Sequence, residues 1–123
     1  MNRARPKNLN LFTIHFPLPA IVSILHRISG AFLFLCIPFA LWLLAFSLTE
    51  TGFDNLQQIF AHGLARLILW LLLIPFIFHL VAGIRHLLSD IHIGDSLKMG
   101  RAMACLTFII SAILVVLAGV WLW

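Results

Sequence analysis

Residues 64–88 read LARLILWLLLIPFIFHLVAGIRHLL, an apolar run that contains His79 and ends close to Arg85 and His86. About 20 consecutive apolar residues are needed for a helix to cross the roughly 30 Å hydrocarbon core of a bilayer, so this run is long enough to span a membrane. A histidine at position 79 of such a helix lies among apolar side chains, where an unsatisfied polar group costs several kcal/mol. The stretch therefore predicts a membrane span that holds a polar group in need of a partner.

The composition of the whole chain agrees with a membrane protein. Its 123 residues are 63% hydrophobic and only 10% charged, a balance that a small soluble domain could not hide from water. Two further apolar runs, at residues 21–48 and 102–123, are also long enough to span. We predict an all-α membrane protein with a single domain over residues 1–123 and three transmembrane helices, at about 21–48, 64–88 and 102–123. Residues 49–63 have helical spacing and could form an interfacial helix.

The basic residues indicate how the chain is oriented. Seven of the eight Lys and Arg residues precede or open the first span or flank the second connection, and only Arg66 lies near the first connection. By the positive-inside rule, the N-terminus and the second connection lie in the cytoplasm and the C-terminus lies outside. The net charge of +4 therefore reflects topology and not nucleic-acid binding. Since no transit-like N-terminus is present, we expect a multi-pass protein of a bacterial inner membrane, in contact with lipid.

The cysteines and the standard cofactor motifs exclude several kinds of site. Cys36 and Cys105 fall in different predicted helices at depths that differ by roughly 14 Å, too far apart to pair. The sequence has no CxxC pair, no GxGxxG pattern and no P-loop. We therefore expect no iron–sulfur, dinucleotide or nucleotide site in this chain.

One polar stripe lies on the second predicted span. His79, Gly83, His86 and Asp90 fall on one narrow face of a helix. A bond to a metal would explain an imidazole at the depth of His79, about 13 Å from the inner end of the span. Gly83 would then leave space for a flat macrocycle such as haem. The alternative is a histidine that is hydrogen-bonded to a neighbouring helix, with Gly83 as an ordinary packing glycine.

A second polar stripe opens the first predicted span. Ser23, His26, Arg27 and Gly30 lie within about a third of the helix circumference. Arg27 supplies a permanent positive charge and Ser23 a small hydrogen-bond donor, which suits a pocket for an anionic or carbonyl-bearing group. The alternative is that Arg27 only anchors the topology and that His26 is an interfacial histidine.

The two stripes form a consistent set if His79 binds haem. No other histidine is expected at mid-depth, so a second axial ligand would come from another polypeptide. We expect the side chains nearer the interface to lie at the level where haem propionates emerge and to offer them cationic or donor groups. These side chains are His26, Arg27, Arg85 and His86.

The residues of the two polar stripes and their neighbours resemble those of a known family. The chain closely resembles the cytochrome b membrane-anchor subunit of succinate dehydrogenase, respiratory complex II. The resemblance lies in three motifs, which are Arg5-Pro6, SILHRISG at residues 23–30 and His79-x-x-x-Gly83-Ile-Arg85-His86-x-x-x-Asp90. The resemblance covers nearly the whole chain, with three spans in the same order. It implies that His79 is one axial ligand of a haem b shared with a second anchor subunit. It also implies that Ser23 and Arg27 border the ubiquinone site and that His26, Arg27 and His86 lie near the propionates.

The resemblance also implies what the protein does. It predicts an anchor for a succinate:ubiquinone oxidoreductase of the tricarboxylic acid cycle and respiratory chain, with no dehydrogenase site of its own. A flavoprotein partner would oxidise succinate, and an iron–sulfur partner would carry the electrons to the membrane. One alternative is the anchor of a fumarate reductase. Another is a small transporter or assembly subunit whose His/Arg stripe conducts protons or binds a substrate anion.

The charge distribution gives a testable prediction about topology. An alkaline phosphatase fused after Trp123 should be active, because we expect this end to lie outside the cytoplasm. A fluorescent protein inserted between residues 90 and 98 should fluoresce, because we expect that connection to lie in the cytoplasm. Activity measurements on intact cells check both fusions. Fluorescence from the C-terminal fusion, together with phosphatase activity from the internal one, would contradict the predicted orientation.

Overall fold

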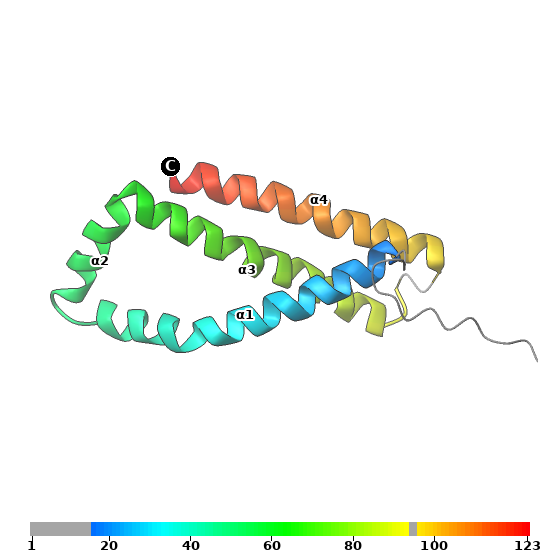
Figure 1. The fold of residues 1–123 in the computed structure, drawn as a ribbon, viewed down its shortest axis with the longest axis horizontal. Coiled ribbons are helices and arrows are strands. Elements are labelled where there is room, and N and C mark those ends of the chain that lie inside the picture. The colour runs from blue at the N-terminus through cyan, green and yellow to red at the C-terminus, as the bar shows by residue number, and fades with distance from the viewer. Residues whose placement is uncertain (1–15, 94–95) are drawn as a thin grey trace, which may run out of the picture.

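The chain is all helical in a computed structural model that describes residues 16–93 and 96–123. Figure 1 shows its helices, α1 (Leu18–Ser47), α2 (Gly52–Ala61), α3 (Gly63–Asp90) and α4 (Leu97–Leu122). The helix expected within residues 49–63 is confirmed as α2. The predicted basic segment at the N-terminus lies outside the described residues.

The long helices α1, α3 and α4 are each apolar and long enough to cross a membrane, which confirms the three predicted spans. The largest difference from the prediction is at the start of α4, which begins at Leu97 and not near residue 102. The Ser96 side chain accepts a hydrogen bond from the Met99 backbone N–H at 3.2 Å, so it caps the helix before the apolar run begins. Similarly, α1 begins at Leu18, since Pro19 is tolerated in the first turn.

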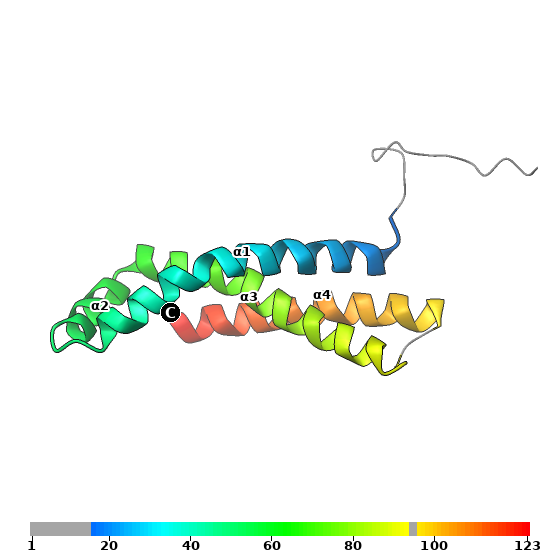
Figure 2. The same ribbon diagram turned by 90° about the horizontal axis from the view of Figure 1, so that it is seen from below.

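The helices are arranged around α3. It contacts α1, α2 and α4. Figure 1 shows α4 running along α3, while α1 crosses α3 near its own beginning and then diverges from it. In Figure 2, α3 is seen to run obliquely relative to α1 and α4. The short helix α2 connects the separated ends of α1 and α3 (Figure 1). The molecule therefore has a close crossing at one end, and α1 and α3 diverge toward the other.

The interior of the bundle is made of small side chains. Membrane helices associate through small residues and polar contacts, because lipid is as apolar as a leucine side chain and provides no hydrophobic driving force between helices. Many large apolar side chains of the described residues are exposed, as expected for surfaces that face lipid. The buried residues include Val22, Ser29, Ala82, Ala104, Thr107 and Ser111.

A tryptophan joins α3 to α4 at the end where α2 lies. The indole Nε1 of Trp70 donates a hydrogen bond to the Val115 carbonyl oxygen at 2.9 Å. A Cβ at Gly119 would lie 3.0 Å from the same nitrogen, so a glycine allows this close approach. The Trp123 ring packs edge-on against Trp70, with ring centroids 6.5 Å apart. Cys36 and Cys105 are free, as predicted.

Replacing Trp70 by Phe should destabilise the α3–α4 contact. The variant keeps an aromatic ring but leaves the Val115 carbonyl without this donor, a loss of about 0.5–1.5 kcal/mol. Thermal unfolding of the purified protein in detergent measures the change. Trp121→Phe is the matched control, because the Trp121 side chain is 82% exposed. Equal unfolding temperatures for the two variants would show that the Trp70 hydrogen bond does not stabilise the bundle.

Candidate functional site

Three imidazoles meet where α1 crosses α3. The His26 ring of α1 stacks on the His79 ring of α3, with centroids 4.2 Å apart and planes inclined by 17°. The His26 ring also lies close to the His86 ring of α3, with centroids 4.9 Å apart and planes inclined by 39°. We call these three side chains the histidine column. The crossing thus brings together the two polar stripes that the sequence places on separate helices.

Two glycines allow the rings to approach the opposite helix. A Cβ at Gly30 of α1 would lie 2.7 Å from Cε1 of His79, closer than real Cβ atoms come to other heavy atoms. A Cβ at Gly83 of α3 would lie 3.4 Å from Nε2 of His26, which is ordinary contact. The glycine beside His79 is therefore Gly30, whereas the sequence alone suggests Gly83. The difference arises because the His79 ring points across to α1, and Gly83 lies one turn further along α3, opposite His26.

The Nδ1 atom of His79 lies in a polar contact with α1. It is 3.1 Å from the backbone carbonyl oxygen of His26 and 3.1 Å from the hydroxyl oxygen of Ser29. The Ser29 hydroxyl in turn donates a hydrogen bond to the same His26 carbonyl at 2.9 Å. Ser29 is only 6% exposed. From the sequence alone Ser29 is only part of a motif and has no predicted role, since a serine next to a polar stripe has no distinctive spacing.

His26 lies closer to the level of His79 along the bundle than the sequence suggests. From the sequence we predict His79 about 13 Å from the inner end of its span and His26 within about one turn of its own. In the structure the His26 carbonyl contacts the His79 ring, so the two residues lie at one level. The physical reason is the early start of α1, since Leu18 is the first helical residue and His26 therefore lies about 12 Å along the helix.

The remaining predicted side chains are placed as follows. Ser23 is half-buried and Arg27, one turn later on α1, is exposed. Arg85 faces α4, where it lines a space of about 290 Å³ together with Met103 and a much smaller one together with Gly100. The structure thus brings His26, His79 and His86 together but turns Arg85 toward the other neighbour of α3. Within residues 16–93 and 96–123, no group of three or more His, Cys, Asp or Glu side chains could hold a metal ion.

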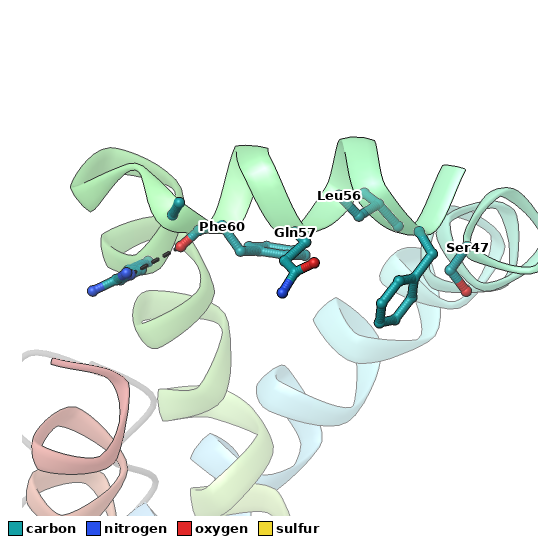
Figure 3. A pocket seen from close by; sticks show the side chains of 7 residues that line it. Ser47, Leu56, Gln57 and Phe60 are labelled. Carbon is teal, nitrogen blue, oxygen red and sulfur yellow. Dashed lines mark hydrogen bonds between the residues drawn. The ribbon is translucent and has the colours of Figure 1, made fainter. Parts of the chain in front are cut away.

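A separate pocket lies at the opposite end of the bundle, below α2. Figure 3 shows Phe60 and Gln57 of α2 lining it, with Ser47 of α1 at the far side. The Arg66 Nε donates a hydrogen bond to the Phe60 carbonyl at 2.9 Å, which joins α3 to the end of α2. An adjoining apolar cavity of about 350 Å³ lies between α1, α2 and α3. The sequence did not predict either space, because each depends on how far the helices diverge.

The sequence is similar to a known family and to several named proteins. The pattern of the succinate dehydrogenase/fumarate reductase transmembrane subunit family matches residues 1–118. A relative from Coxiella burnetii, named succinate dehydrogenase cytochrome b556 subunit, is 46% identical over 125 aligned positions that cover 100% of both chains. Relatives of the same name from Rickettsia felis and Rickettsia bellii are 35% and 33% identical over 95 positions. They cover 76% of this chain and 73% and 74% of the relatives' own lengths.

The close approach at Gly30 predicts which glycine the crossing depends on. Gly30→Ala should destabilise the protein by about 1–3 kcal/mol, the usual result of overpacking, because the new methyl group overlaps the His79 ring. Gly83→Ala is the matched control from the same crossing, since its methyl group would make only ordinary contact. Thermal unfolding of both purified variants in detergent provides the comparison. An unfolding temperature for Gly30→Ala at or above that of Gly83→Ala would contradict the structure at this point.

Proposed function

Because the chain belongs to the succinate dehydrogenase/fumarate reductase transmembrane subunit family, we propose that it is the haem b-binding membrane anchor of a succinate:ubiquinone oxidoreductase. All of residues 1–123 form one anchor domain in this proposal. The observation that carries it is the polar contact at His79 Nδ1. The protein works in a bacterial inner membrane, with the N-terminus in the cytoplasm, as the distribution of Lys and Arg favours.

The chemistry of His79 fits a haem ligand. A carbonyl oxygen only accepts hydrogen bonds, so the nitrogen that faces the His26 carbonyl, Nδ1, carries the ring proton. The lone pair is then on Nε2, the atom available to iron. Metal-bound histidines characteristically donate their other N–H to a carbonyl or carboxylate in this way. His79 would hold the iron through Nε2, and a second, smaller anchor subunit would share the haem and supply the other ligand.

The other members of the histidine column serve the edge of the haem. His26 and His86 lie within ring-stacking distance of each other, and His26 stacks on His79. Their ring N–H groups, together with the guanidinium of Arg27, provide donors for the two propionate carboxylates. When bound, the haem supplies reversible one-electron transfer. The chain's own residues hold it in place and balance its negative charge.

Quinone binding is assigned to Ser23 and Arg27. They lie one turn apart on α1, where Ser23 is half-buried and Arg27 exposed. Arg27 would stabilise negative charge that develops on a quinone oxygen, and the Ser23 hydroxyl would donate a hydrogen bond to it. Ubiquinone takes up two electrons and two protons at this site. The electrons come from succinate through the flavoprotein and iron–sulfur subunits.

The direction of the reaction separates the proposal from its main alternative. The family description includes fumarate reductases as well as succinate dehydrogenases. The three relatives reported above are all named for succinate dehydrogenase, which favours succinate oxidation for this chain. Membership of this family argues against the transporter and assembly alternatives.

The assignment of His79 gives a spectroscopic prediction. His79→Leu in the purified complex should lower the haem content or leave a high-spin iron that binds carbon monoxide, because one axial ligand is gone. Absorption spectra of the oxidised, reduced and carbon monoxide-treated complex measure this. His62→Leu is the control, since His62 is exposed and lies outside the histidine column. An unchanged low-spin spectrum in His79→Leu would rule out this ligand.

The quinone assignment gives a kinetic prediction. Ser23→Ala and Arg27→Leu should each reduce succinate:quinone turnover, because losing a hydrogen-bond donor to a charged oxygen costs about 1.5–3 kcal/mol, or roughly ten- to hundredfold in rate. Succinate oxidation by an artificial acceptor that draws electrons from the soluble subunits should be unchanged.

The haem content of both quinone-site variants serves as the control, because Arg27 is also assigned to a propionate. If both variants assemble with haem and reduce quinone at the parental rate, the quinone pocket lies elsewhere.

A further inference from the structure

We propose that Ser29 is a positioning residue for His79, whose hydroxyl oxygen helps to fix the ring and tune the midpoint potential of the haem. The inference rests on the proposed function, because it takes His79 as the axial ligand. It goes further in assigning a role to a residue that makes no contact with haem or quinone in that proposal. The role follows from the three hydrogen-bonding atoms that meet at the helix crossing.

The contacts favour one arrangement of protons. The Ser29 hydroxyl has a single hydrogen, and its bond to the His26 carbonyl at 2.9 Å uses it. The Ser29 oxygen can therefore only accept from His79 Nδ1, which lies 3.1 Å away. The His26 carbonyl, also 3.1 Å from Nδ1, can likewise only accept. The Nδ1–H of His79 is thus shared between two oxygens of α1, and both fix the same tautomer.

The surroundings prevent water from replacing the serine. Ser29 is only 6% exposed, and the His79 ring lies against the backbone at Gly30. Because Ser29 is buried, water has little room to take the place of its oxygen, so the loss of this acceptor is poorly compensated. Gly30 contributes by letting the ring come close enough for both oxygens to reach Nδ1.

The hydrogen bonds at Nδ1 also act on the iron. An imidazole whose N–H donates to good acceptors is a more basic ligand and gives more electron density to the metal. Such a ligand stabilises the ferric state relative to the ferrous state. Removing the Ser29 oxygen leaves one acceptor out of two, so the ferric state loses part of this stabilisation. The midpoint potential of the haem should therefore rise.

The test compares Ser29→Ala, Ser29→Thr and Ser47→Ala in the purified complex. Ser47 is the matched control, because it lies on the same helix and its hydroxyl donates to the Leu44 carbonyl at 2.7 Å, the same local bond without an imidazole. Potentiometric titration of the haem spectrum gives the midpoint potential. Electron paramagnetic resonance of the ferric haem reports the orientation and strength of the axial ligand.

We expect Ser29→Ala to keep a low-spin haem whose midpoint potential is higher by up to about 59 mV, the equivalent of a tenfold change in the ferric-to-ferrous preference. Ser29→Thr, which retains the hydroxyl, and Ser47→Ala should stay close to the parental potential. Haem lost from Ser29→Ala but retained at the parental potential in Ser29→Thr would also support the role of the hydroxyl.

Two results would overturn the inference. One is a Ser29→Ala complex with the potential and resonance spectrum of Ser47→Ala. The other is a Ser29→Thr complex that behaves as Ser29→Ala does, since the hydroxyl would then not be the group that matters. Either result leaves the ligation by His79 standing. That part of the proposed function fails only if the His79→Leu complex keeps its low-spin haem.

Discussion

The contact between the His79 ring and the backbone of α1 at Gly30 determines how the two helices cross. A Cβ at position 30 would come within 2.7 Å of the ring, so only glycine permits this approach. The same approach brings the His26 carbonyl and the Ser29 hydroxyl within 3.1 Å of Nδ1. Inside a membrane, lipid offers no hydrogen bonds, and polar groups must find partners within the protein. The close crossing gives the His79 ring N–H of α3 two oxygen acceptors on α1.

The two ends of the bundle are built differently as a result. At the crossing, small residues and polar contacts hold α1 against α3, and the rings of the histidine column pack against one another. Toward α2, helices α1 and α3 separate, and hydrogen bonds there join α3 to α4 through Trp70 and to α2 through Arg66. In the proposed function the haem is held at the end where α1 crosses α3. A ligand that is fixed by packing and by two hydrogen-bond acceptors keeps its geometry when the iron changes charge.

The sequence predicts the spans well, because the thickness of the bilayer sets the length of apolar helix that is needed to cross it. It also identifies His26, His79 and His86, since a polar side chain in such a run is conspicuous. It does not predict the contacts of Ser29 and Gly30 with His79, which depend on the rotation and crossing of two helices. The early start of α4 could have been recognised from Ser96, a common capping residue.

The central claim is that the His79 imidazole is what makes the haem low-spin, and rescue by free imidazole tests it most directly. In a complex that carries His79→Gly, the substitution removes the ring and leaves space at its position. The purified variant complex should lack the low-spin haem spectrum, and added imidazole should restore it. A low-spin spectrum equal to that of the parent complex in the absence of imidazole would contradict the account.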